Sequence, residues 1–120
     1  MKNKTLVLGA TENPARYSYL AVKKLLSKGQ AVLAIGKTGG IVDGVQIDKE
    51  PMPSEEVDTV TMYLNALHQK AYYDYILSLK PRRIIFNPGA ENEELEQIAN
   101  KAGIETIEAC TLVMLTTGQF

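Results

Sequence analysis

The stretch KTLVLGATENPARYSYLAVKKLLSKGQAVLAI, residues 4–35, decides the fold. Two short apolar runs, residues 4–8 and 31–35, flank a segment whose apolar side chains recur at helical spacing. The second run shows no polar alternation, which is typical of a parallel strand that helices cover on both faces. A strand, a helix and a second parallel strand form a right-handed βαβ unit. The stretch therefore predicts an α/β protein.

The turn GATENP, residues 9–14, joins the first strand to the helix. Asn13 suits the N-cap position because its side-chain oxygen can accept a hydrogen bond from an unpaired backbone N–H. Pro14 suits the first helical position because its ring presets φ, and Gly29 suits the position after the helix. We therefore expect a helix from Pro14 to about Lys28. Its apolar face is expected to contain Tyr17, Ala21, Val22, Leu25 and Leu26.

The rest of the chain repeats this alternation of strands and helices. We expect further strands at 58–64, 83–86 and 104–108, and helices at 66–79, from Asn92 to about Gly103, and at 110–117. Residues 36–56 hold four glycines, two prolines and Asp43-Gly44, and are read as turns with a possible short edge strand at 45–47. The pattern predicts one Rossmann-like three-layer domain, residues 1–120, with a mainly parallel five-stranded sheet.

Composition excludes several classes of function. A formal net charge of -1 gives no general attraction to nucleic acid or to an anionic membrane. Cys110 is the only cysteine and His68 the only histidine, so an internal disulfide and a zinc site are not expected. The apolar run near the N-terminus is shorter than that of a secretory signal. We expect a cytoplasmic protein with a small-molecule ligand.

In a parallel sheet the ligand binds at the carboxyl ends of the strands, where the turn from Gly9 to Arg16 lies. Gly9 matches the first glycine of a dinucleotide-binding motif, but Thr11 and Pro14 replace the second and third. The helix N-terminus still offers unpaired N–H groups, and the Thr11 hydroxyl can donate to a phosphate oxygen. Arg16 in the first helical turn is unfavourable unless an anion binds beside it. The alternative is an ordinary tight turn with a solvated arginine.

The end of the second strand argues against NAD. NAD-binding domains usually have an acidic residue there for the ribose hydroxyls, whereas this chain has Gly36-Lys37. Lys37 suits a phosphorylated ribose, which both NADP and coenzyme A carry, or is simply solvated. The residues therefore favour a phosphate-rich nucleotide ligand over NAD.

The chain resembles the CoA-binding domains similar to the N-terminal domain of the succinyl-CoA ligase alpha subunit, in particular their small stand-alone relatives. Those relatives have a Gly-Ala/Leu-Ser turn followed by Pro-x-Arg-x-Ser-Tyr and a helix that ends in glycine. The matching positions here are Gly9, Pro14, Arg16, Ser18, Tyr19 and Gly29. VDTV (57–60), GAENEE (89–94) and AGIETIEAC (102–110) also resemble the family. The chain departs from it at Gly36-Lys37, where Asn-Pro is common, and at Leu64, where a basic residue is common.

This resemblance implies a Rossmann-like fold that binds coenzyme A, with the diphosphate over the first turn and the adenosine toward the second and third strand ends. The cofactor-binding residues expected on this chain lie after four successive strands. They are Gly9, Ala10, Thr11, Asn13 and Arg16, then Gly36 and Lys37, then Asn65, and then Asn87, Pro88 and Gly89.

The sequence favours binding over catalysis. Cys110 and His68 have no visible partners that would make a catalytic triad or dyad, so the first is read as a small buried side chain and the second as capping or solvated. A thiol-handling enzyme that uses Cys110, and an NADP-binding or other nucleotide-binding regulatory module, remain as alternatives. Tyr72, Tyr73 and Tyr75 share helical spacing; at least one should pack in the core, and an exposed remainder would allow self-association.

Overall fold

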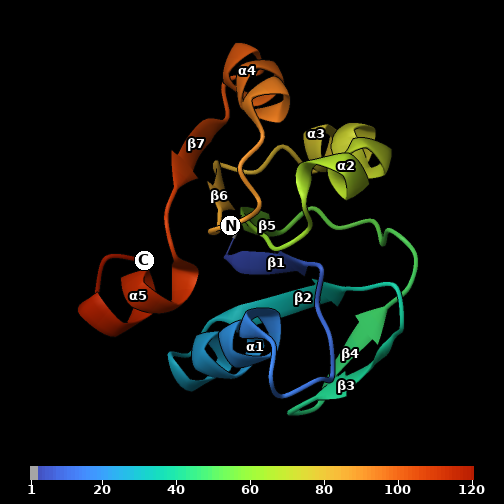
Figure 1. Cartoon of the computed structure of the whole chain (residues 1–120), viewed down its shortest axis with the longest axis vertical. Helices are drawn as coiled ribbons and strands as arrows, with labels where there is room; N and C mark the ends of the chain where they lie inside the picture. Colours follow the sequence, from blue (N-terminus) through green and yellow to red (C-terminus); the bar gives the residue numbers. More distant parts are fainter. Residues whose placement is uncertain (1–2) are drawn as a thin grey trace.

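The computed structural model describes residues 3–120 and contains one seven-stranded sheet over that range. The strand order is β3-β4-β2-β1-β5-β6-β7, and every pair is parallel except β3 with β4 (Figure 1). The strands are β1 (Lys4–Leu8), β2 (Ala31–Ile35), β3 (Gly40–Val42), β4 (Val45–Asp48), β5 (Val57–Met62), β6 (Arg83–Phe86) and β7 (Glu105–Glu108). The helices are α1 (Tyr17–Ser27), α2 (Ala66–Gln69), the 3-10 helix η1 (Lys70–Tyr72), α3 (Tyr73–Leu79), α4 (Glu93–Lys101) and α5 (Thr111–Thr117).

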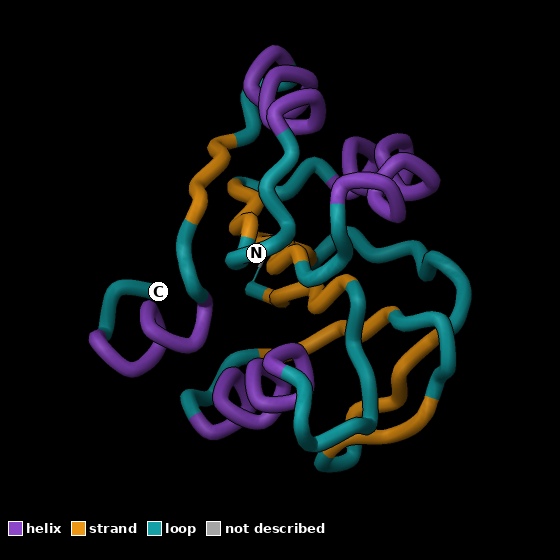
Figure 2. The backbone as a smooth tube through the Cα atoms, viewed as in Figure 1, coloured by secondary structure: helices purple, strands orange, loops and turns teal. Residues whose placement is uncertain are grey.

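Helices cover both faces of the sheet (Figure 2). Leu6 and Leu8 of β1 belong to the core under α3 and α4, whereas Val7 between them belongs to the core under α1 and α5. Successive strand residues point to opposite faces, so one apolar run supplies both cores. The three-layer, mainly parallel α/β class predicted from the sequence is confirmed.

The predicted count of five strands is wrong, because residues 36–56 contain a β-hairpin. Asp43 and Gly44 both have positive φ, 48° and 84°, which is the two-residue hairpin turn that Asp-Gly favours. The strand expected near 45–47 exists as β4, but it pairs with β2 and is not at the edge of the sheet. The edge strand is β3, which the glycine-rich composition of its surroundings concealed.

Two helix predictions also need correction. The first helix begins at Tyr17, not Pro14, with Arg16 as its N-cap residue. Tyr17 therefore lies at the helix end, where it is 72% exposed instead of packing on the sheet. The helix expected at 66–79 is divided into α2, η1 and α3. The amide of Gln69, fully buried at the end of α2, donates to the carbonyls of Leu64 and Ala90, and this anchor lies where α2 gives way to the tighter turn of η1.

The helix expected after Asn92 is confirmed. The Asn92 side-chain oxygen accepts a hydrogen bond from the Leu95 N–H at 3.2 Å. Three glutamates occupy the first turn of α4, where negative charge is favourable. No helix within residues 3–120 is long and apolar enough to span a bilayer.

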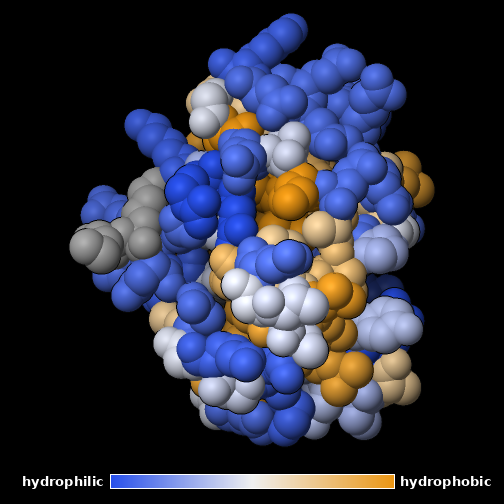
Figure 3. Space-filling model, turned by 90° about the vertical axis from the view of Figure 1, so that its left-hand side faces the viewer, coloured by the Kyte–Doolittle hydropathy of each residue, from blue (hydrophilic) through white to orange (hydrophobic). Residues whose placement is uncertain are grey.

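The side of the molecule that carries β7 and α5 has an apolar area beside hydrophilic residues (Figure 3). Ile107 of β7 and Val113 of α5 are among the exposed large apolar residues. Strand β7 has Glu105 and Glu108 at its two ends. Antiparallel pairing of this edge with a second copy would bring glutamates together, so its charges oppose sheet extension.

The three tyrosines Tyr72, Tyr73 and Tyr75 are all half-buried and pack against the core.

Glu96 on α4, which bonds to Glu108 of β7, gives the fold a pH dependence. Partial burial is the largest cause that raises the pKa of Glu96 on α4 above the ordinary value of 4.5. The hydrogen bond to Glu108 and the negative charge of Glu108 raise this pKa further. A raised pKa means that the folded protein holds this proton more tightly than the unfolded chain does. Wild-type stability is therefore lost as the pH rises through the pKa of the folded state.

Replacing Glu108 with Gln should increase the free energy of unfolding at pH 7 by roughly 0.2–1 kcal/mol, the range for a partly exposed charge pair. The gain should disappear below pH 4.5, where Glu96 is protonated in both states. Urea unfolding of both proteins at pH 7 and pH 4 measures this difference. The exposed Glu55→Gln serves as the control, and a gain of equal size at both pH values would contradict the assignment.

Candidate functional site

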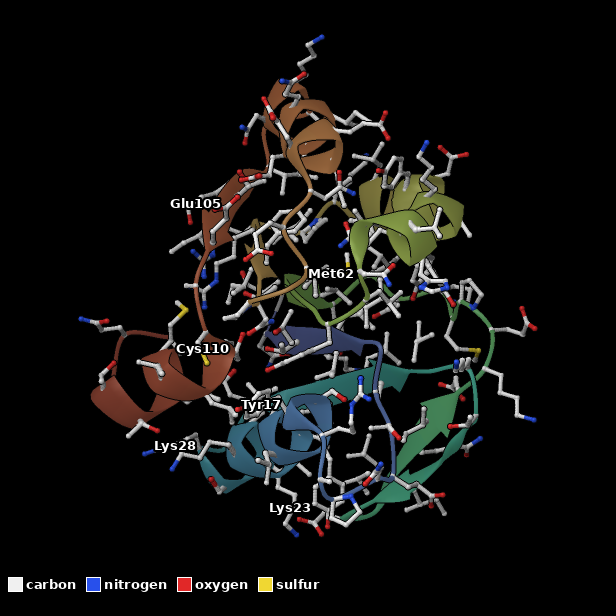
Figure 4. The ribbon with its side chains drawn as sticks, in the orientation of Figure 1. Tyr17, Lys23, Lys28, Met62, Glu105 and Cys110 are labelled. Carbon is white, nitrogen blue, oxygen red and sulfur yellow. The ribbon has the colours of Figure 1, made fainter. Side chains whose placement is uncertain are left out.

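The candidate site lies at the carboxyl ends of the parallel strands. The loops that follow them are 9–16 after β1, 36–39 after β2, 63–65 after β5, 87–92 after β6 and 109–110 after β7. Figure 4 labels three residues of this region: Met62, which ends β5, Tyr17, which begins α1, and Cys110, which precedes α5. The central parallel strands thus bring loops far apart in sequence to one edge of the sheet.

The loops after β1 and β2 touch through their backbones. The N–H groups of Gly9 and Ala10 both donate to the Ile35 carbonyl at 2.9 Å. A side chain at Gly36 would place its Cβ only 1.9 Å from the Ala10 carbonyl oxygen. Gly36 is therefore needed for this close approach, and Gly9, with φ of 100°, turns the chain away from the end of β1.

The side chains of Thr11 and Asn13 stabilise the turn itself. The Thr11 hydroxyl oxygen accepts from the Asn13 N–H at 3.1 Å, and the Asn13 side-chain oxygen accepts from the Ala15 N–H at 3.0 Å. The predicted helix-capping role of Asn13 is therefore wrong, since its oxygen caps a turn before the helix. The Thr11 hydroxyl can still donate its proton outward.

The N-terminus of α1 has the properties of an anion site. Its N-cap residue, Arg16, makes no side-chain capping bond, and the first turn contains no acidic residue. The N–H groups of Tyr17, Ser18 and Tyr19 have no acceptor within the helix. Unpaired N–H groups and the helix dipole favour a negatively charged group, and the exposed Arg16 adds a full positive charge.

The remaining predicted site residues differ in what their side chains do. Lys37 is exposed beside Gly36, and Pro88 and Gly89 are exposed after β6. Asn65 is exposed, and its side-chain oxygen caps α2 by accepting from the His68 N–H at 3.0 Å. These residues lie at the edge of the sheet that also holds the loop after β1.

Asn87 is instead turned into the protein. Its side-chain N–H groups donate to the Thr61 hydroxyl and the Met62 carbonyl at 2.8 and 3.0 Å, and its oxygen accepts from the Thr111 N–H at 2.8 Å. The residue is 2% exposed. The Asn87 amide therefore joins β5, β6 and the start of α5, and is engaged within the protein.

Gln69 is a second structural amide, which the sequence analysis missed. It joins the loops after β5 and β6 through the carbonyls of Leu64 and Ala90, and its oxygen accepts from the Asn92 side chain at 2.8 Å. A glutamine on a short helix carries no sequence signal for such a role. The two loops on this side of the site are thus held by buried amides.

Tyr63 lies in the loop after β5, and Cys110 lies in the loop after β7. The Tyr63 hydroxyl is buried and has no hydrogen-bond partner within the described part of the chain, and burial raises the pKa of Tyr63 to about 12. Its neighbours Thr61 and Thr111 bond to each other, with their hydroxyl oxygens 2.7 Å apart. Cys110 is half-buried at the N-cap position of α5.

A hollow of about 410 Å3 lies beside the loop after β2, over the β3–β4 hairpin. Its lining combines backbone, apolar and charged groups. The lining residues are Thr38, Gly39, Gly40, Ile41, Gln46, Ile47, Asp48 and Lys49.

Comparison with known families agrees with this geometry. The model of the CoA binding domain family matches residues 3–116, which is nearly the whole chain. The chain belongs to the CoA-binding domain family. This membership supports a role in coenzyme A binding in general, and it confirms the family resemblance found in the sequence. No curated protein gives a significant match to the chain.

Solved structures share the fold. The crystal structure of an uncharacterized protein is 52% identical and has a TM-score of 0.96, with 100% of this chain and 99% of that chain covered. A conserved hypothetical protein from Pyrococcus furiosus is 26% identical with a TM-score of 0.80, over 92% of this chain and 97% of its own. A protein from Thermus thermophilus, 21% identical with a TM-score of 0.85 over 99% and 91% of the two chains, shows the same fold.

The structural role of Asn87 in this CoA-binding domain can be tested by mutation. Asn87→Ala leaves the Thr111 N–H without its buried acceptor and removes the amide donor to the Thr61 hydroxyl and the Met62 carbonyl, so it should lower the free energy of unfolding by roughly 2–4 kcal/mol. Denaturant unfolding followed by circular dichroism measures the loss. Asn65→Ala, which removes only the exposed cap of α2, is the matched control and should cost about 1 kcal/mol or less. Equal losses in the two variants would contradict the assigned role of Asn87.

Proposed function

We propose that this chain binds coenzyme A or an acyl-CoA without transforming it, with the ligand's diphosphate at the N-terminus of α1. The observation that carries this proposal is the uncapped first turn of α1 beside Arg16, in a chain of the CoA-binding domain family. Three unpaired N–H groups and a guanidinium suit the two negative charges of a diphosphate.

The adenosine end of the ligand is proposed to extend toward the loop after β2. Gly36 brings that loop against residues 9–16, which we call the phosphate turn. Lys37 lies exposed beside Gly36. The second strand itself is followed by Gly36-Lys37 and not by the acidic residue with which NAD-binding domains usually bind the ribose hydroxyls. Lys37, and Lys49 in the hollow beside the loop after β2, can instead meet a phosphorylated ribose.

A binding role fits the two residues with catalytic chemistry. His68 is exposed on α2, whereas Cys110 precedes α5, and these helices cover opposite faces of the sheet (Figure 1). No hydrogen bond or ion pair among the described residues joins the two side chains. A nucleophile activated by a neighbouring base needs such a contact.

Isothermal titration calorimetry with coenzyme A, NADP, NAD and ATP tests the choice of ligand. Arg16→Ala should weaken coenzyme A binding about tenfold, or roughly 1.4 kcal/mol, because it removes a charge-assisted contact to the diphosphate. Lys28→Ala, at the opposite end of α1, is the matched control and should bind as the wild type does. No binding of coenzyme A at millimolar concentration would overturn the proposal, and tighter binding of NADP would favour the NADP-binding alternative.

The thiol of Cys110 is not required by this proposal. Cys110→Ser should leave the affinity for coenzyme A unchanged, since the proposed diphosphate contacts come from the first N–H groups of α1 and from Arg16, and none from the Cys110 thiol. Calorimetry of this variant, with mass spectrometry of the wild type after treatment with coenzyme A disulfide, provides the measurement. A mixed disulfide at Cys110 together with weaker binding in the serine variant would support a thiol-handling enzyme instead.

A further inference from the structure

Glu12, in the middle of the phosphate turn, has its carboxylate anchored outside the turn. Its Oε2 accepts a hydrogen bond from the backbone N–H of Ile41 in β3, at 2.9 Å. The two residues are 29 positions apart in the chain, yet the loop after β1 runs down to the hairpin before it returns to α1 (Figures 1 and 2).

The neighbouring residue of β3 leaves room for this carboxylate. A Cβ at Gly40 would lie 2.1 Å from the carboxyl carbon of Glu12 and 2.5 Å from its Oε1. The Glu12 side chain therefore lies directly over the Gly40 backbone, in space that any other residue at position 40 would fill. A hydrogen bond and a close steric fit thus act at the same place.

The hairpin that receives Glu12 is also held to α1. The Lys23 ammonium contacts both carboxylate oxygens of Asp43 at 3.0 Å, which joins the hairpin turn to the helix. The hairpin is consequently connected to the turn through Glu12 and to the helix through Lys23. This arrangement gives the turn a fixed support on the side opposite the helix N-terminus.

Anchoring matters because an unanchored carboxylate in this turn would compete with the ligand. The uncapped N–H groups of α1 attract any nearby anion, and Glu12 lies only four positions before the N-cap residue Arg16. The Ile41 N–H holds the Glu12 carboxylate at the hairpin. The same bond fixes the backbone between Thr11 and Asn13, which carries the phosphate-facing groups.

We infer that Glu12 is a positioning residue of the anion site: by binding the hairpin, it holds the phosphate turn in its ligand-binding conformation and keeps its own charge from the helix N-terminus. This inference rests on the proposed function. It assigns to the β3–β4 hairpin the role of a support for ligand binding.

The first test compares Glu12→Ala with Glu12→Gln in calorimetric titrations with coenzyme A and with inorganic pyrophosphate. Glu12→Ala removes the anchor and should weaken binding of both ligands about tenfold, or roughly 1.4 kcal/mol. Glu12→Gln keeps an oxygen that accepts from the Ile41 N–H, so it should restore near wild-type affinity. If Glu12 acted only by repelling phosphate, both variants would bind more tightly than the wild type, and that result would overturn the inference.

A second test uses the close fit at Gly40. Gly40→Ala must displace the Glu12 carboxylate without removing it, so binding should weaken more than in Glu12→Ala. The double variant lacks the displaced carboxylate and should bind coenzyme A as Glu12→Ala alone does. Thermal unfolding confirms that each variant is folded. Gly40 has a φ of 117°, so its substitution also costs stability. If Gly40→Ala does not fold, the comparison of Glu12→Ala with Glu12→Gln decides the question.

The outcomes separate this inference from the function on which it rests. A wild type that binds neither coenzyme A nor pyrophosphate overturns the proposed function, and the inference with it. A wild type that binds coenzyme A while Glu12→Ala binds it equally well overturns only the role of Glu12.

Discussion

The parallel pairing of β1 with β2 and β5 is the constraint on which the rest of this structure depends. It brings the carboxyl ends of these strands to one edge and sets the N-terminus of α1 beside them. Residues from distant parts of the sequence therefore meet at that edge. The anion site proposed at α1 rests on backbone geometry, since the first N–H groups of the helix have no acceptors within it and no side chain of the N-cap residue caps them.

The loops around this edge are held in different ways. On the β1–β2 side, contact depends on missing side chains: Gly36 and Gly40 let the Ala10 carbonyl and the Glu12 carboxylate approach the backbone. On the β5–β6 side, the buried amides of Asn87 and Gln69 join the loops through hydrogen bonds. Buried amides must be satisfied, so these loops are fixed in place.

Sequence reasoning succeeded where the signal was local. The apolar runs of β1, β2 and β6 and the capping of α4 by Asn92 depend on neighbouring residues. It failed at the start of the first helix, where Asn13 can cap either the helix or a local turn, and where partners were distant. The helix was expected to begin at Pro14 because Asn13 can cap, but that oxygen is engaged by Ala15 in a preceding turn. The bonds of the Asn87 side chain to β5 and α5 were not expected, whereas the place of Asn87 in the ligand site stays a prediction.

By itself, the sequence determined the alternation of strands and helices, the three-layer class and the family, because hydrophobic periodicity and turn residues act over a few positions. Only the tertiary structure decided that the glycine-rich segment forms a hairpin added to the sheet, that Asn87 is structural, and that Glu12 binds the Ile41 N–H. Each of these depends on which backbone or side-chain group lies opposite in space. Chain spacing does not specify that neighbour, whereas the packed sheet does.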